Sequence, residues 1–393
     1  MSPWNFLDHP EFIAASRAGS VAVSIHPEGQ ACMRVGIIAH LKYPISEPFA
    51  GGLEMHTHML ARLLRQAGHD VRLYAAEGSD PALSPETMGP PTGEPQTQLA
   101  LEHIALAEHR AYKRILQKLR IDPPDVIHNN SLHYLPVDVA HLLPAPMLTV
   151  LHTPPFPELR NAVAEQLPEA LPLLAVSASV AQEWRPWRKD VEIVPNGVEL
   201  DRFRAMNHSV PRNHALWYGR MVPEKGPHLA IDAARMAGMP LRMAGAICDT
   251  DYWHGEVAPR LGGAISYIGH LDHASLAEEL AAAAVAVCTP RWEEPFGLVV
   301  AEALASGTPV AGFARGALPQ ILDAECGVLA PADDVPALAR SIRAAAGLSR
   351  AACRRRAESI CDAGTMIAAY EAAYLALLQR RPLPGGRVAS QSL

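Results

Sequence analysis

Residues 293–310 read EEPFGLVVAEALASGTPV, and this stretch decides the fold. The apolar run at 285–288 just before it predicts a buried strand that leads into a proline-containing loop. The pattern predicts a helix that starts near Gly297 and ends at Gly307, because glycine favours the position after a helix C-terminus. A second short strand at 309–311 follows at once. The unit is therefore strand, loop, helix and strand, which is typical of an α/β protein.

The start of this helix is a predicted anion-binding site. The N–H groups of Phe296, Gly297 and Leu298 have no acceptor within the helix, and the helix dipole adds positive potential there. Such helix starts bind phosphate groups. Glu294 precedes the helix and Glu302 lies about one turn into it. Carboxylates repel a bare phosphate but accept hydrogen bonds from sugar hydroxyls, so we expect a ligand with both groups, as in a nucleotide-sugar.

The composition sets broad limits. A chain of 393 residues with 49% hydrophobic and 19% charged residues predicts two globular domains. The net charge of −7 argues against a general nucleic-acid surface. The six cysteines lack CxxC and zinc spacings, which indicates free thiols in a reducing compartment. Because neither a membrane-spanning run of roughly 20 apolar residues nor a secretory signal is present, we predict a cytoplasmic protein.

A glycine pair marks the opening of the first domain. A strand at 34–39, a helix at 53–67 and a strand at 70–75 predict a right-handed βαβ unit. Gly51 and Gly52 stand at its strand-to-helix turn, where glycine lets a ligand approach the backbone closely. The alternative is that both glycines serve only the turn.

A histidine follows a later strand of the first domain. The strand at 147–151 leads directly into His152 and three residues that include two prolines. The carboxyl ends of parallel strands are where open α/β sheets bind ligands, so His152 is a candidate site residue. His128 and His133, near the end of the neighbouring strand, are weaker alternatives.

A second predicted anion-binding site lies at the start of the second domain. After a predicted linker at 205–213, a strand at 215–219 leads into a loop with Arg220 and Lys225. A guanidinium grips phosphate through two donors and an ammonium adds a point charge. The chain has only five lysines against 29 arginines, so a lysine at this position is informative.

Two further patterns each have two readings. Asp249, Thr250 and Asp251 form a D-x-D triplet, which is typical of a metal site, although Asp249 also suits the start of the helix that follows; we favour the cap. The helix predicted at 97–120 carries a basic stripe that includes Arg114. The stripe suits contact with an anionic membrane or acceptor, or else a solvated face, and we favour the solvated face.

Together these motifs resemble retaining glycosyltransferases of family 4 with the GT-B fold. The resemblance covers roughly residues 33–380. It is carried by Glu294 and Glu302 eight residues apart, the glycine corner ending at Glu54, the phrase VPNGVE at 194–199, and the loop from Arg220 to Lys225. A departure is Gln320, where the family more often has Glu. The resemblance implies two facing, doubly wound, Rossmann-like α/β domains with a cleft between them.

The resemblance also implies domain bounds and roles. We expect an N-terminal extension at 1–32, an acceptor domain at 33–205, a nucleotide-sugar domain at 206–364, a helix crossing back at 365–381 and a tail at 382–393. The expected catalytic residues are His152, Arg220, Lys225 and Glu294. The expected donor-binding residues are Gly51, Gly52, Arg220, Lys225, Glu294, Phe296, Gly297, Leu298 and Glu302.

The implied reaction is hexosyl transfer from a nucleotide-sugar, most typically UDP-linked, with retention of configuration. The departing phosphate would help to deprotonate an acceptor that the sequence does not identify. We expect no cofactor, no metal and no nucleic-acid partner. We also expect no membrane-spanning segment, while a peripheral contact with a membrane stays open. Two alternatives stay open, namely a nucleotide-sugar epimerase and a catalytically idle nucleotide-sugar-binding protein.

Overall fold

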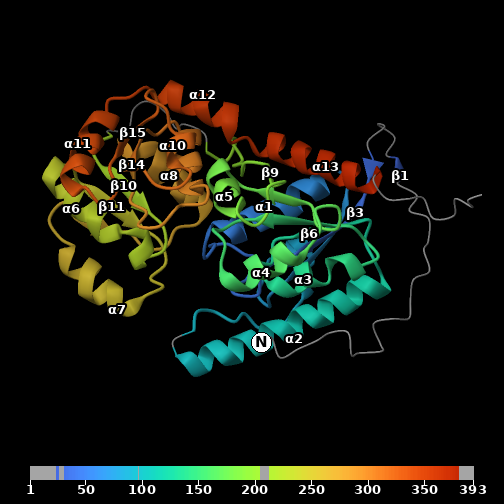
Figure 1. Cartoon of the computed structure of the whole chain (residues 1–393). Helices are drawn as coiled ribbons and strands as arrows, with labels where there is room; N and C mark the ends of the chain where they lie inside the picture. Colours follow the sequence, from blue (N-terminus) through green and yellow to red (C-terminus); the bar gives the residue numbers. More distant parts are fainter. Residues whose placement is uncertain (1–23, 26–30, 96, 204–211, 380–393) are drawn as a thin grey trace, which may run out of the picture.

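The computed structural model describes residues 24–25, 31–95, 97–203 and 212–379 (Figure 1). Within these residues, two parallel sheets of seven and six strands each carry helices and form two α/β domains. This confirms the predicted fold class. Most of the predicted linker at 205–213, most of the extension at 1–32 and the tail at 382–393 lie outside the described residues.

The first sheet has the strand order β5-β4-β3-β6-β7-β8-β9, with every pair parallel. Its strands are β3 (Arg34–Ile38), β4 (Asp70–Ala75), β5 (Glu86–Thr87), β6 (Val126–Asn129), β7 (Met147–Leu151), β8 (Leu173–Ala175) and β9 (Glu192–Ile193). Its helices are α1 (Gly52–Gln66), α2 (Gln98–Ile121), α3 (Tyr134–Asp138), α4 (Pro157–Glu165) and α5 (Ala178–Trp184). The central strands are apolar and buried because helices cover both faces.

The second sheet has the order β12-β11-β10-β13-β14-β15 and is also parallel throughout. Its strands are β10 (Ala215–Tyr218), β11 (Leu241–Ala244), β12 (Ile265–Tyr267), β13 (Val285–Cys288), β14 (Val310–Phe313) and β15 (Gly327–Ala330). Its helices are α6 (Pro227–Ala237), α7 (Thr250–Tyr252), α8 (His273–Ala282), α9 (Leu298–Ala305), α10 (Leu318–Ile321), α11 (Val335–Ala345) and α12 (Arg350–Ile360).

The strand orders determine where a ligand can bind. In the first sheet the chain reverses direction across the sheet between β3 and β6, and in the second between β10 and β13. A crevice forms at such a switch point, outside the carboxyl ends of the two strands. The glycine corner follows β3, the Arg220 loop follows β10, and the Glu294 loop follows β13. Both crevices therefore carry the residues that the sequence singled out.

The last helix belongs spatially to the first domain. Helix α13 (Ala363–Gln379) starts two residues earlier than predicted and contacts α1 and β6. Figure 1 shows it running from the second domain along the first. Its apolar side packs Tyr370 and Tyr374, both fully buried, into the core of the first domain.

The structure adds detail to three segments of the prediction. Residues 76–96 are rich in Pro, Gly, Ser and Thr, a composition typical of a surface loop, but β5 within this segment pairs with β4 and widens the sheet. In the extension, Ser24–Ile25 pairs antiparallel with Ala31–Cys32. On the basic stripe of α2, Arg114 donates to the Met88 carbonyl and Lys118 pairs with Glu86 at 3.0 Å. These contacts hold part of the stripe against the first domain, whereas the favoured prediction was a solvated face. No helix in the described ranges has the length and apolar character needed to cross a membrane.

Candidate functional site

A cavity of about 660 Å³ lies between the two domains. A volume of this size suits a small-molecule ligand. All of the predicted site residues line it, namely Gly51, Gly52, His152, Arg220, Lys225, Glu294, Phe296, Gly297, Leu298 and Glu302. Motifs that are more than 200 residues apart in the chain therefore face one cavity.

The start of α9 forms part of the cavity wall. Gly297 is its N-cap and has φ +86°, a left-handed conformation that favours glycine. An added Cβ would also lie 3.2 Å from Leu318, so space is short as well. From the opposite domain Gly52 approaches Leu298 so closely that a Cβ would lie 2.8 Å from its Cδ1. The glycine corner and the helix start thus lie side by side across the cavity.

Glu302 is buried behind this helix start. Its carboxylate is 4% exposed, and the Tyr218 hydroxyl lies 2.8 Å from its Oε2 and 2.7 Å from the Val299 carbonyl. Burial raises the pKa of Glu302 to about 7, although the hydrogen bond from Tyr218 lowers it. Near neutral pH the side chain is therefore poised between its acid and its carboxylate form.

Glu294 and Lys225 contact each other directly. Lys225 Nζ lies 2.6 Å from Glu294 Oε2, and the Trp292 indole N–H donates to the same oxygen at 3.0 Å. The ammonium also lies 5.1 Å from the centre of the Trp292 ring, within cation–π range. Lys225 was predicted to bind phosphate and Glu294 to bind sugar hydroxyls, whereas in the structure the two side chains contact each other and Trp292. An anion entering the cavity competes with Glu294 for Lys225.

Arg220 faces a carboxylate from the other domain. Its Nη1 lies 3.6 Å from Glu94 Oε1, and its Nη2 lies 3.6 Å from Glu224 Oε1. Glu94 is also held by Lys42 at 2.7 Å and by the Tyr43 hydroxyl at 3.1 Å. At 3.6 Å the guanidinium is close to both carboxylates without being locked by either, and a phosphate group can displace them.

The His152 ring is fixed by a buried hydrogen bond to Asn130. Its Nε2 lies 2.8 Å from Asn130 Oδ1, and its ring is 7% exposed. Burial lowers the pKa of His152 well below its usual value, and the neighbouring histidines add to the shift. Of the two alternatives, His133 lines the cavity and His128 lies behind it, fully buried.

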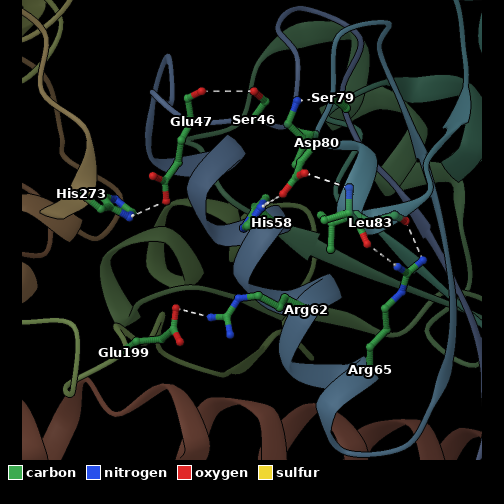
Figure 2. Close-up of polar contacts among 12 residues, drawn as sticks. Ser46, Glu47, His58, Arg62, Arg65, Ser79, Asp80, Leu83, Glu199 and His273 are labelled. Carbon is green, nitrogen blue, oxygen red and sulfur yellow. Dashed lines mark hydrogen bonds and ion pairs between the residues drawn. The ribbon is translucent and has the colours of Figure 1, made fainter.

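The two domains also meet at the cavity rim (Figure 2). Glu47, on the loop before α1, points at His273 of the second domain, with Oε1 3.4 Å from Nδ1. The other ring nitrogen of His273 lies 3.9 Å from Glu302 Oε1. Arg202 lies 3.3 Å from the same Glu47 oxygen, close to where the chain passes between domains. Glu47 of the first domain and Glu302 of the second domain are thus separated in space by the His273 ring.

The D-x-D triplet lies outside this cavity. Asp249 caps the short helix α7, accepting a hydrogen bond from the Tyr252 N–H at 2.8 Å. This geometry matches the capping role that we favoured. Whether the reaction needs a metal stays a prediction.

Sequence reasoning missed several cavity residues, chiefly Tyr218, Trp292, His273, Glu47 and Glu94. Two of them carried a local signal, because Tyr218 stands at a strand end directly before the Gly219-Arg220 loop and Trp292 directly before the Glu293-Glu294 pair. The others come from loops whose approach to the cavity depends on how the two domains meet.

The chain is similar to known proteins along most of its length. The model for Glycosyltransferase Family 4 matches residues 50–202, and that for Glycosyl transferases group 1 matches residues 201–359. The chain is 29% identical over 392 residues to glycogen synthase of Mycobacterium tuberculosis (strain ATCC 25618 / H37Rv), which covers 85% of this chain and 94% of that protein. It is 28% identical over 324 residues to phosphatidyl-myo-inositol mannosyltransferase of the same strain, covering 77% and 83%.

Solved structures share the fold. Sucrose-phosphate synthase from Thermosynechococcus elongatus superposes with a TM-score of 0.71 at 22% identity, covering 88% of this chain and 100% of that chain. Anabaena HepE, in complex with UDP and glucose, gives a TM-score of 0.68 at 18% identity, covering 88% and 100%.

Proposed function

The chain belongs to glycosyltransferase family 4, and on that basis we propose that it transfers a hexosyl group from a UDP-linked sugar to an acceptor hydroxyl, with retention of configuration. One observation carries the proposal. A single cavity between two α/β domains is lined by two cations, a helix start and two carboxylates, which together complement a diphosphate and a polyol. UDP and glucose bound to Anabaena HepE, a protein of the same fold, agree with this ligand class.

The proposed roles follow the position of each group. Arg220, Lys225 and the N–H groups of residues 296–298 hold the diphosphate and stabilise its charge as it leaves. Glu294 and His152 bind hydroxyls of the sugar, and Glu302 binds the ribose. Gly51 and Gly52 let the donor approach the first domain closely.

The proposed step needs no nucleophile from the protein. The bond between the anomeric carbon and the phosphate oxygen breaks, and the acceptor oxygen forms its bond to the same face of that carbon. The acceptor proton passes to the departing phosphate oxygen. Because two cations and a helix start already compensate the diphosphate charge, we propose that the reaction does not depend on a metal.

Two alternatives predict different products. An epimerase needs no acceptor, and an idle binding protein gives no product. One of the relatives reported above is a mannosyltransferase by its name, which favours transfer. We further propose a cytoplasmic location, in agreement with six free cysteines.

The test is a panel of nucleotide-sugars, incubated with and without a cell-extract acceptor pool and analysed by mass spectrometry. Acceptor-dependent release of nucleoside diphosphate supports transfer. Conversion without an acceptor supports the epimerase, and absence of any product with retained UDP binding supports the idle protein. Arg220→Ala should lose turnover, while Arg343→Ala, an exposed arginine outside the cavity, is the matched control.

A further inference from the structure

A buried hydrogen-bond chain connects the cavity to helix α13. The Tyr374 hydroxyl lies 2.6 Å from His128 Nδ1. His128 Nε2 lies 2.9 Å from Asn130 Oδ1, and His152 Nε2 lies 2.8 Å from the same oxygen. All four side chains are at least 93% buried, and only His152 lines the cavity.

The partners determine which atom carries each proton. Asn130 Oδ1 only accepts hydrogen bonds, so both Nε2 atoms facing it must carry protons. His128 is neutral because burial lowers its pKa to about 4, and with a proton on Nε2 its Nδ1 is an acceptor. Tyr374 then donates to that Nδ1, and burial raises the pKa of Tyr374 well above its usual value, so the donor proton is retained.

The opposite orientation of the Asn130 amide leaves the Tyr374 hydroxyl proton without an acceptor. If Asn130 turned its amide, it would donate to both histidines, and both would carry their protons on Nδ1. His128 would then donate to the Tyr374 oxygen. The Tyr374 proton would have no acceptor among the described residues, and a buried donor without an acceptor is unfavourable.

We propose that Tyr374, acting through His128 and Asn130, is a positioning residue that fixes the proton of His152 on Nε2. Its Nδ1, which makes no hydrogen bond within the described chain, is thereby a hydrogen-bond acceptor. It takes the O–H of a neutral sugar hydroxyl and disfavours a carboxylate or carbonyl oxygen, which has no proton to donate. Only this last step rests on the proposed donor site; the proton assignment stands without it.

The chain offers a matched control one helical turn away. Tyr370 lies on the same helix, is also fully buried, and stacks on Tyr374 with ring centres 6.5 Å apart. Its hydroxyl has no hydrogen-bond partner among the residues that the structure describes. Tyr370→Phe and Tyr374→Phe therefore remove the same atom from neighbouring sites, and only the second removes a donor from the chain to His152.

The test is 15N NMR of the histidine side chains in the full-length protein without ligand, since the 15N shift distinguishes a protonated ring nitrogen from one with a lone pair. His152→Gln assigns the signals. In the wild type and in Tyr370→Phe we expect His152 to carry its proton on Nε2. In Tyr374→Phe neither arrangement satisfies His128 Nδ1, so we expect both tautomers of His152 in about equal amounts. An unchanged Nε2 proton in Tyr374→Phe, or the same loss in Tyr370→Phe, would overturn the proposal.

Kinetics separate this inference from the proposed function. With half of the molecules in the accepting tautomer, kcat/KM for a donor that the panel shows to be turned over should fall about twofold in Tyr374→Phe and stay unchanged in Tyr370→Phe. UDP affinity should not change in either variant. If the tautomer shifts as expected but kcat/KM does not, the assignment of His152 to the sugar is wrong, and the role of Tyr374 in fixing the tautomer stands.

Discussion

Replacing Glu302 with glutamine should stabilise the protein at pH 8. The buried side chain is costly to ionise, and the amide copies its protonated form. A glutamine N–H can donate to the Tyr218 oxygen while Tyr218 donates to the Val299 carbonyl, so the hydrogen-bond pattern at 2.7–2.8 Å is kept. The substitution therefore removes a charge and keeps both hydrogen bonds of the Tyr218 hydroxyl.

The magnitude follows from the pKa of Glu302, which rises from 4.5 to about 7 on folding. The difference of about 2.5 pH units corresponds to about 3 kcal/mol. Between these two pH values the folded state binds more protons than the unfolded state, so wild-type stability falls as the pH rises from 4.5 to 7. A glutamine at position 302 does not ionise, so the variant does not lose stability in this way as the pH rises. The variant should be more stable by about 3 kcal/mol at pH 8 and by less than about 1 kcal/mol at pH 5.

Thermal unfolding at the two pH values is the assay. For an unfolding unit of 150–250 residues each kcal/mol moves Tm by roughly 2–4 °C, so Tm should rise by roughly 6–12 °C at pH 8. Glu54→Gln is the control with the opposite sign. Burial raises the pKa of Glu54, but the hydrogen bond from His40, the charges of His40 and Arg220 and a backbone hydrogen bond together lower it overall. The substitution should therefore destabilise the protein at pH 8. A Glu302→Gln variant that gains no stability at pH 8, or gains the same amount at pH 5, refutes the reasoning.

Three further predictions concern the ligand. Arg220→Ala and Lys225→Ala should each lower kcat/KM by about 10²-fold with the fold intact by circular dichroism, and near-wild-type turnover in both would exclude the phosphate site. Activity should survive EDTA and Asp251→Ala; loss on chelation that Mn²⁺ restores would establish a metal requirement. UDP affinity by titration calorimetry should rise about tenfold from pH 6 to pH 8, because ribose hydroxyls favour the Glu302 carboxylate, whose pKa is about 7 before UDP binds. An affinity that falls with pH would contradict the ribose contact.

The sequence was sufficient for the fold because its signals are local. Strand and helix bounds, and motifs such as the Glu294–Glu302 pair, depend on residues close together in the chain. The contacts between motifs are different. Tyr218 meets Glu302 and Lys225 meets Glu294 only because β10 lies beside β13, and no local pattern encodes that neighbour relation.

Two features that were not predicted from the sequence also depend on contacts between segments that are distant in the chain. Strand β5 has two residues, too few to show a hydrophobic period, and exists because β4 offers it a free edge. Glu94 reaches Arg220 from a loop of the other domain. Its position depends on how the two domains meet, which the spacing of residues does not determine.

The docking of α13 on the first domain has a consequence for how the protein is made. A ribosome completes the whole second domain before it reaches Tyr370 and Tyr374, although both fill the core of the first. At about 5–20 residues per second, the roughly 160 residues from Phe203 to Ala363 take roughly 10–30 s to synthesise. During that interval the nascent first domain lacks the two tyrosine rings that pack against His128. Its folding is completed only when α13 emerges, so the two domains mature together and not one after the other.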